Sequence, residues 1–281
     1  METTQAYALF QEMIATAEKE LFDFTLNSKI NIEHKADKSA VTQCDKQIDA
    51  KLTEIAHSAG FQVVSEEGAH VLDIVKSGNY MTIDPIDGTL GYIEYINYAA
   101  ENGGLANFAQ KDLGAQSDFC LLLAIIEGGQ PKYGACYNFI TKEKIFIDAA
   151  NGNSLIRENN VRGYTQSNAI YLDQRFLDDP ITKELLSMPN IDAITQAAFG
   201  LKSIYTLINP HQNAVTVHRV QSAGLWDVMP AAVAAKALGG NILDDRGDPL
   251  SFTSYILLPG SGATVIKGDL FKFVQNKLKN S

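Results

Sequence analysis

The sequence predicts a protein of mixed α and β structure in two parts, an α+β part over residues 1–160 and an α/β part over residues 161–281. The first part opens with stretches of helical periodicity and continues with strand-like stretches joined by glycine-rich turns, as in an antiparallel sheet. In the second part strand-like and helix-like stretches alternate. A chain of 281 residues is long enough to bury the core of two closely packed halves.

Two amphipathic helices are expected near the N-terminus. Apolar residues recur at helical spacing over residues 7–22 and again over residues 41–60. At the start of the second stretch, Thr42 and Asp45 have the spacing of a capping box, and Gly60 is suited to ending the helix.

Two strands that end in carboxylates are expected next. One runs into "SEEG" (65–68), and the other runs through "YMTIDPIDGT" (80–89), where Pro85 favours an extended conformation for Asp84. Residues 94–116 have weak periodicity and several glycines, so we expect an irregular excursion there, in the form of a flap.

The remaining elements complete the two parts. Glycine-rich and Asn-Gly turns between apolar stretches predict an antiparallel meander over residues 118–156. Beyond it we expect strands in "AIYLD" and "AVTVHRV", a helix that begins at Pro180, and a helix in "WDVMPAAVAAKALGG" that ends at Gly239.

Composition excludes several classes of function. The formal net charge is −10 and no block of Lys or Arg is present, so we expect no nucleic-acid partner. The three cysteines form no CxxC pair, which argues against a zinc site or a disulfide framework. The longest apolar run, "CLLLAII", is too short to span a bilayer, and the N-terminus does not resemble a signal peptide. We therefore expect a cytoplasmic protein without a membrane partner; its assembly is left open, with a homodimer as one option.

Three acidic motifs stand out: "SEEG", "DPIDGT" and "LWD" (225–227). Each has a plain structural interpretation, since Asp227 could be a helix N-cap, Asp45 a capping-box residue, and "SEEG" a surface turn. If the motifs converge, however, carboxylates about 5 Å apart would repel by roughly 3 kcal/mol per pair at an effective dielectric constant near 20. A cluster of these acids would need cations.

One rival interpretation is a phosphatase of the haloacid dehalogenase type, because "PIDGTL" is close to its D-x-D-G-T signature. In that class the nucleophile is an aspartate two residues before the second acid. Here that position is Pro85, which has no nucleophilic side chain. The chemistry therefore excludes this class.

In this order, "SEEG", "DPIDGT" and "WD" followed by a helix resemble the three signature motifs of the inositol monophosphatase superfamily, and the resemblance extends over most of the chain. Within it, "KADKSAVTQCD" (35–45), "FCLLLAIIEGGQPKYGACYN" and "LWDVMPAAVAAKALGGNILDDRGDPL" are most similar to bacterial 3'(2'),5'-bisphosphate nucleotidases of the CysQ type. The resemblance implies a layered α/β/α/β/α sandwich of the inositol monophosphatase and fructose-1,6-bisphosphatase type.

The resemblance also implies a magnesium centre with two or three ions. By position, Glu67, Asp84 and the Ile86 carbonyl would bind one Mg²⁺. Asp84, Asp87 and Asp227 would bind a second, and a third would be held loosely near Glu67. Inhibition by Li⁺ and by Ca²⁺ is implied as well.

The implied reaction is hydrolysis of a phosphomonoester by a metal-activated water, without a covalent intermediate. Thr89, held by Asp45, resembles the pair that orients and deprotonates this water, with Glu67 beside the first metal. The backbone N–H groups of Gly88 and Thr89 would hold the phosphate, and Asp87 and Asp227 would contact the substrate through the metals.

The substrate is a small phosphorylated metabolite, and the resemblance favours adenosine 3',5'-bisphosphate, cleaved to AMP and phosphate. The chain departs from the nucleotidase pattern at "AFGLKS" (198–203), where Ala198, Phe199 and Gly200 replace a Gly-Ser-Ser-like stretch. Lys202 remains, and it and Arg219 are candidates for binding a second phosphate.

Two alternatives remain open. Inositol 1-phosphate is the alternative substrate, although Val220 stands where inositol monophosphatases carry a glutamate. A non-catalytic regulatory module that keeps the fold and the metals is the alternative from another class of function.

Overall fold

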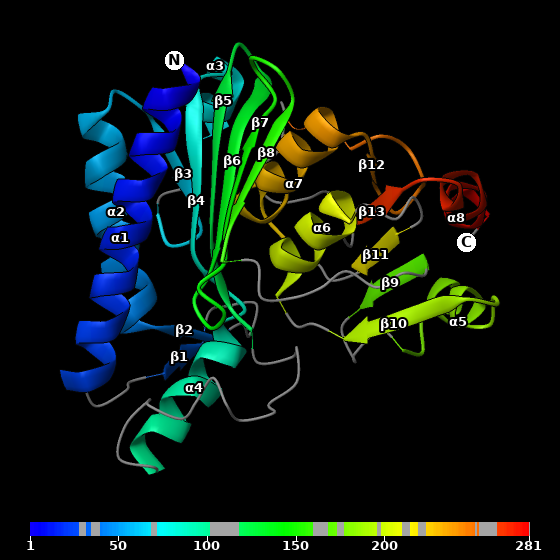
Figure 1. The fold of residues 1–281 in the computed structure, drawn as a ribbon, viewed down its shortest axis with the longest axis horizontal. Helices are drawn as coiled ribbons and strands as arrows, with labels where there is room; N and C mark the ends of the chain where they lie inside the picture. Colours follow the sequence, from blue (N-terminus) through cyan, green and yellow to red (C-terminus); the bar gives the residue numbers. More distant parts are fainter. Residues whose placement is uncertain are drawn as a thin grey trace.

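The computed structural model describes residues 1–27, 32–34, 40–68, 72–101, 118–159, 168–172, 177–195, 198–209, 214–218, 223–250, 252 and 263–280. Its elements form five layers, in the order helices, sheet, helices, sheet, helices (Figure 1). The layered sandwich expected from the sequence is confirmed.

The first sheet has six strands, in the order β3 (Val63–Ser65), β4 (Tyr80–Asp87), β5 (Cys120–Glu127), β6 (Gln130–Asn138), β7 (Lys144–Asp148) and β8 (Ser154–Glu158). β3 runs parallel to β4, and every other neighbouring pair is antiparallel. The antiparallel meander expected over residues 118–156 is therefore confirmed.

The second sheet has five strands, in the order β10 (Ile191–Thr195), β9 (Asn168–Leu172), β11 (Ala214–His218), β13 (Ala263–Lys267) and β12 (Asn241–Leu243). β9 is parallel to both β10 and β11, whereas β13 is antiparallel to β11 and to β12. The first sheet thus ends at residue 158 and the second begins at residue 168.

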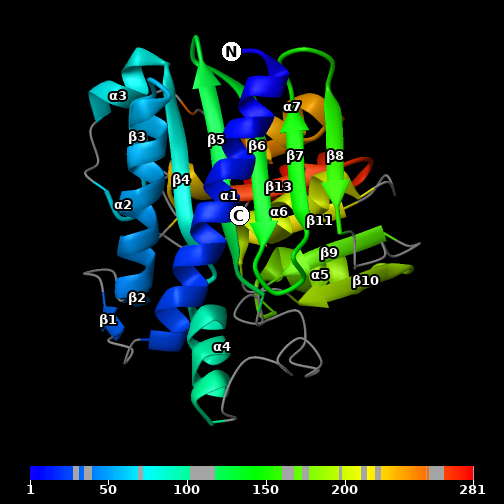
Figure 2. The same cartoon turned by 60° about the vertical axis from the view of Figure 1, so that its left-hand side comes forward.

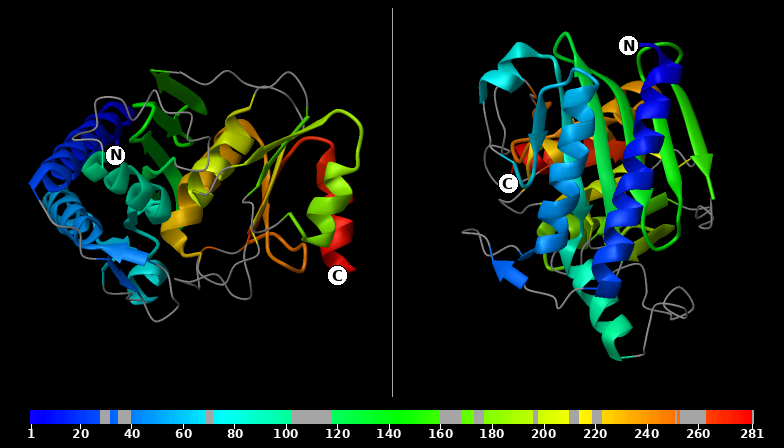
Figure 3. Two further views of the ribbon diagram at one scale, coloured as in Figure 1. Left: turned by 90° about the horizontal axis from the view of Figure 1, so that it is seen from below. Right: turned by 90° about the vertical axis from the view of Figure 1, so that its left-hand side faces the viewer.

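Helices fill the three remaining layers. α1 (Thr3–Asn27) and α2 (Gln43–Ser58) lie side by side on the outer face of the first sheet (Figure 2 and Figure 3). α6 (Phe199–Ile208) and α7 (Leu225–Leu238) lie between the sheets, and α5 (Pro180–Leu186) and α8 (Leu270–Lys279) cover the far face of the second. The smaller elements are β1 (Ile32–His34), β2 (Ala40–Thr42), α3 (Leu72–Ser77) and α4 (Thr89–Glu101).

Alternation along β5 explains how one sheet serves two cores. Leu121, Leu123 and Ile125 belong to the apolar cluster shared with α1 and α2. Leu122 and Ala124 belong to the cluster shared with α6 and α7. Successive side chains of a strand point to opposite faces, so the continuous apolar run "CLLLAII" is the pattern of a strand buried on both sides.

Helix ends follow the expected signals. Pro180 is the first residue of α5, and Asp179 caps that helix by accepting hydrogen bonds from the backbone N–H groups of Ile181 (2.9 Å) and Thr182 (3.1 Å). α7 ends before Gly239, which has a φ of 77° that glycine adopts without strain. Among the described residues no helix is both long enough and apolar enough to cross a membrane.

The expectation of an irregular flap over residues 94–116 is wrong for its first part. α4 continues to Glu101, and it buries Tyr92 and Ile96, which are four residues apart on one face of the helix. The glycines that suggested irregular structure come only after the helix has ended. Residues 102–117 lie outside the described residues.

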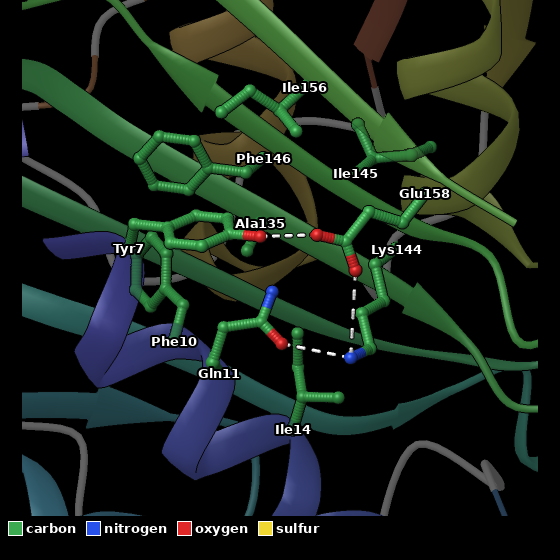
Figure 4. Close-up of a pocket in the computed structure, with 10 residues that line it drawn as sticks. All are labelled: Tyr7, Phe10, Gln11, Ile14, Ala135, Lys144, Ile145, Phe146, Ile156 and Glu158. Atoms are coloured by element: carbon green, nitrogen blue, oxygen red, sulfur yellow. Dashed lines mark hydrogen bonds and ion pairs between the residues drawn. The ribbon is translucent and has the colours of Figure 1, made fainter. Parts of the chain in front are cut away.

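Polar contacts hold α1 against the edge of the first sheet. Tyr7 donates a hydrogen bond to Glu158, and Lys144 Nζ donates one to Gln11 Oε1 at 2.9 Å while lying 3.8 Å from Glu158 Oε2 (Figure 4). The cavity among these side chains is about 10 Å³, at the lower limit of what one water needs. This region is therefore a packed contact and not a ligand site.

A buried ion pair ties the first sheet to α6. Glu143 is almost fully buried, and its Oε1 accepts from Arg157 Nε at 2.7 Å while its Oε2 accepts from the Tyr205 hydroxyl at 2.7 Å. Because Tyr205 belongs to α6, this network helps to fix how the central helices sit on the sheet.

Replacing Arg157 should destabilise the protein strongly. Arg157→Met would leave the Glu143 carboxylate buried without its cation, and we expect the free energy of unfolding to fall by about 3 kcal/mol in urea denaturation. The matched control is Lys76→Met, whose partner Asp73 is exposed; it should cost less than about 0.5 kcal/mol. Equal losses in the two variants would show that the Glu143 network is unimportant.

Candidate functional site

Three aspartates converge where the first sheet meets α6 and α7. One carboxylate oxygen each from Asp84, Asp87 and Asp227 lie within 4.8 Å of one another. Asp84 is 1% exposed and Asp87 is 6% exposed. The structure therefore brings together the acids of "DPIDGT" and "LWD", which are 140 residues apart in the chain.

An irregularity in β4 places the first two aspartates on one face. Asp84 pairs with Leu122 and Asp87 pairs with Cys120, so two residues of β4 stand opposite one residue of β5. In a regular strand, residues three apart would point to opposite faces. The extra residue between Asp84 and Asp87 brings both carboxylates to the face toward α6 and α7.

Asp87 caps α6 from outside that helix. Its Oδ1 accepts from the backbone N–H of Phe199 at 3.1 Å, and its Oδ2 accepts from Gly200 at 2.7 Å and from Leu201 at 3.2 Å. The residue before α6, Ala198, has no side chain that can cap. Asp87 thus satisfies three N–H groups that the first turn of a helix leaves without intrahelical partners.

Gly200 permits this close approach. A β-carbon at that position would lie 3.1 Å from Asp87 Oδ2 and 3.1 Å from the backbone oxygen of Asp227, and it would overlap the side chain of Leu122. Any larger residue would therefore push α6 away from the cluster.

Asp227 has both of the roles considered for it, with one correction. It is not the N-cap of α7, which is Gly224, but the third residue of the helix. Its Oδ2 accepts from the Gly224 N–H at 2.6 Å, which helps to cap the helix. One carboxylate oxygen therefore serves the helix end while the side chain also belongs to the acidic cluster.

Glu66 lies against Asp84, and the role expected for its neighbour Glu67 stays a prediction. The Asp84 carboxyl is hydrogen bonded to Glu66. The strand register explains this, because Ser65 pairs with Ile83 and the Glu66 N–H donates to the Ile83 carbonyl at 3.1 Å, which brings Glu66 level with Asp84. Glu66 also follows Val64 by two residues, so it continues the face that Val64 shares with the central helices.

The predicted Thr89 and Asp45 pair is also assembled. The Thr89 hydroxyl lies 3.5 Å from Asp45 Oδ1 and 3.3 Å from the Ile86 carbonyl oxygen, both long for hydrogen bonds. Thr89 is the first residue of α4, directly after Gly88, whose φ of 92° turns the chain out of β4. Asp45, in the first turn of α2, is 1% exposed. Its expected capping partner, the Thr42 side chain, lies outside the described side chains.

Lys202 occupies a different environment from the one expected. It is 0% exposed within α6, and its positive charge acts on Asp87. Its role in binding a second phosphate stays a prediction. The other candidate, Arg219, and Val220 lie outside the described side chains.

Burial makes the cluster difficult to ionise. Burial raises the pKa of Asp84 well above its ordinary value, with further increases from the charges of Glu66, Asp87 and Asp227. Burial raises the pKa of Asp87 to about 6, against the lowering effects of the Leu201 N–H and of Lys202.

These residues fit a divalent cation. Hard carboxylate oxygens that converge at this spacing are ligands of the kind that Mg²⁺ and Ca²⁺ prefer. A cation would also favour the ionised forms that burial disfavours.

The raised pKa of Asp87 predicts that the metal-free protein loses stability as the pH rises. Between the ordinary value of 3.8 and about 6, the folded state holds a proton that the unfolded state has already released. The contribution of Asp87 to the free energy of unfolding therefore falls across this window and stays low above it. Thermal denaturation in EDTA at pH 4 to 7 measures this effect.

Asp87→Asn is the control for that pH dependence, because it removes the titrating group and keeps an acceptor for α6. Its melting temperature in EDTA should depend less on pH than that of the wild type. Mg²⁺ at pH 7 should raise the melting temperature of the wild type more than that of the variant. Identical pH profiles would contradict the assignment.

Comparisons with known proteins extend this description. Residues 2–267 match the model of a family described as the inositol monophosphatase family. No curated protein sequence matches the chain.

Solved structures of similar fold include an IMPase/NADP phosphatase complexed with NADP and Ca²⁺, at 15% identity and a TM-score of 0.73, covering 100% of this chain and 97% of that one. A Thermotoga maritima IMPase matches at 16% identity and a TM-score of 0.68, with 99% and 97% covered. The suhB protein of Bartonella henselae matches at 16% identity and a TM-score of 0.66, with 97% of each chain covered. At these identities the structures support the fold.

Proposed function

Because the chain belongs to the inositol monophosphatase family, we propose that it is a Mg²⁺-dependent phosphomonoesterase of small metabolites, with adenosine 3',5'-bisphosphate as its preferred substrate. The observation that carries the proposal is the buried cluster of Asp84, Asp87 and Asp227 next to the Thr89 and Asp45 pair. Cation ligands and a proton acceptor for water thus lie within one small region.

The chain offers ligands for two or three Mg²⁺ ions. Asp84 with Glu66 and the Ile86 carbonyl would hold one, and Asp84, Asp87 and Asp227 would hold another. This proposed ligand set takes Glu66 in place of the Glu67 expected from the sequence, and the contact of Glu66 with Asp84 supports that choice. When bound, the cations would neutralise phosphoryl oxygens and make the attacking water more acidic.

The residues around the cluster supply the remaining parts of the reaction. The Thr89 hydroxyl orients the water, and Asp45 accepts the proton that passes through that hydroxyl. The backbone N–H groups of Gly88 and Thr89 lie at the start of α4, where the positive end of the helix favours a phosphate. Li⁺ and Ca²⁺ are expected inhibitors, and one staphylococcal relative of this fold was crystallised as a LiCl-soaked inhibitory complex.

The substrate proposal rests on shared chemistry. Structures of similar fold include complexes of IMPase/NADP phosphatase with NADP and with D-inositol-1-phosphate. Both ligands carry a phosphate on a secondary hydroxyl of a ring, and NADP carries it on an adenosine ribose. The 3'-phosphate of adenosine 3',5'-bisphosphate has the same chemistry, and the nucleotidase-like stretches of the sequence favour it.

Inositol 1-phosphate is the second candidate substrate. Lys202, the expected partner of a 5'-phosphate, is fully buried, and a substrate with a single phosphate needs no such partner. The three cysteines of the chain are buried and free, as suits an enzyme of the reducing cytoplasm.

Phosphate release from a panel of substrates tests the proposal. Adenosine 3',5'-bisphosphate, NADP, inositol 1-phosphate and fructose 1,6-bisphosphate would be compared with Mg²⁺ and with excess EDTA. We expect release only with Mg²⁺, fastest from adenosine 3',5'-bisphosphate and with AMP as product. A hundredfold preference for inositol 1-phosphate would establish the second candidate, and no release from any phosphomonoester would indicate a non-catalytic module.

Thr89→Ala tests the role of the hydroxyl. Loss of the group that orients the water should lower kcat roughly 10²-fold or more while leaving divalent-ion binding nearly unchanged. Thr53→Ala is a matched control on α2, two turns beyond Asp45, and should keep a normal kcat. A raised KM with normal kcat in Thr89→Ala would assign Thr89 to substrate binding instead.

A further inference from the structure

A cleft lies where α2, β3 and α3 meet, at the β3 edge of the first sheet. Its volume is about 400 Å³, within the range of roughly 300–1,000 Å³ that is typical of small-molecule sites. The described residues that line it include the apolar Phe61, Val63 and Ile74 and the polar Asp49 and Ser65. An apolar wall with a few polar groups is the usual composition of a ligand site.

The cleft is separate from the acidic cluster. Val64 belongs to the apolar cluster shared with the central helices, whereas Val63 packs against the apolar cluster of α1 and α2. Side chains alternate along a strand, so Ser65 shares the face of Val63 toward α2, and Glu66 shares the face of Val64. The cleft and the acidic cluster therefore lie on opposite faces of the first sheet.

Two buried polar residues form the floor of the cleft. Asp49 is 7% exposed and Ser65 is 2% exposed, whereas His57, eight residues after Asp49 on the same face of α2, is exposed at the rim. Gly68 lies beside both floor residues. A β-carbon on Gly68 would lie 2.5 Å from Ser65 Oγ and 4.0 Å from Asp49 Oδ2, so the loop after β3 closes one side of the cleft.

Asp49 gives the cleft a preference for cations. The described residues that line it include one acid, Asp49, and no lysine or arginine. A carboxylate in such a partly apolar wall attracts a cation more strongly than one in water, because the local dielectric constant is lower. The ring of Phe61 in the same wall adds to this preference, since aromatic rings attract ammonium groups.

We propose that this cleft is a second ligand site, for a small organic cation whose ammonium group binds Asp49 and whose apolar body packs against Phe61 and Val63. The Ser65 hydroxyl supplies a further acceptor for the ammonium N–H groups. The apolar part of the wall offers no oxygen ligands to a metal ion, which favours an organic cation instead. The inference goes beyond the proposed function and does not depend on phosphatase activity.

Ligand-observed NMR in EDTA tests the proposal with phenethylammonium and its neutral analogue phenethyl alcohol. The wild type should bind the ammonium roughly tenfold more tightly than the alcohol, the scale of one hydrogen bond to a charged group. In Asp49→Asn this preference should disappear, because the amide carries no charge. The matched control is Glu54→Gln, which removes the same charge from the face of α2 next to α1 and should keep the preference.

A second variant keeps the test informative if Asp49→Asn folds poorly. Ala50 is exposed at the rim of the cleft, so Ala50→Trp should obstruct the cleft and weaken the binding of both ligands. Equal affinity of the wild type for the two ligands, or no binding of the ammonium at all, would overturn the proposal. Ammonium binding that Mg²⁺ abolishes and that Asp49→Asn leaves unchanged would place the cation at the acidic cluster, which would overturn it as well.

Discussion

The contact between the Asp87 carboxylate and the first turn of α6 is the interaction on which the site depends. β4 belongs to the first sheet and α6 lies between the sheets, so three hydrogen bonds to one side chain fix the central helices relative to the acidic face of β4. Farther along α6, the hydrogen bond from the Tyr205 hydroxyl to Glu143 holds the same helix against the first sheet. Asp227, at the start of α7, can then lie beside Asp84 and Asp87.

The cluster has an energetic cost that the surrounding fold offsets. Buried carboxylates beside one another disfavour ionisation, and the pKa of both Asp84 and Asp87 is raised accordingly. Backbone N–H groups at the starts of two helices stabilise these acids. Asp87 accepts from Gly200 in the first turn of α6, and Asp227 accepts from Gly224 at the start of α7. A site of this kind is less stable when empty than when it holds cations, which makes metal binding favourable and keeps the ligands in place.

Much of the fold was accessible from the sequence, because apolar periodicity and turn residues report local structure. Pro180, Gly239 and the run around Leu122 marked a helix start, a helix end and a strand buried on both faces, and the structure agrees. The acidic motifs also indicated which aspartates converge in the folded chain. The sequence did not predict the helix through Ile96, because its apolar face is short and the glycines that follow it suggested irregular structure.

The site details that sequence reasoning does not reach depend on register and on long-range packing. Placing Glu66 beside Asp84 requires the pairing of β3 with β4, since one residue more reverses the direction of a side chain. The burial of Lys202 requires the docking of α6 onto Asp87, for which "AFGLKS" contains no local signal. The contact of Glu66 and the burial of Lys202 both arise only in the folded chain.

The most direct test of the account is an anomalous difference map from crystals of the protein soaked in Mn²⁺. The account predicts a peak at coordination distance from Asp84, with Glu66 and not Glu67 beside it, and a weaker peak between Asp87 and Asp227. A map without peaks at Asp84, or with Mn²⁺ held by Glu67 away from the three aspartates, would contradict it.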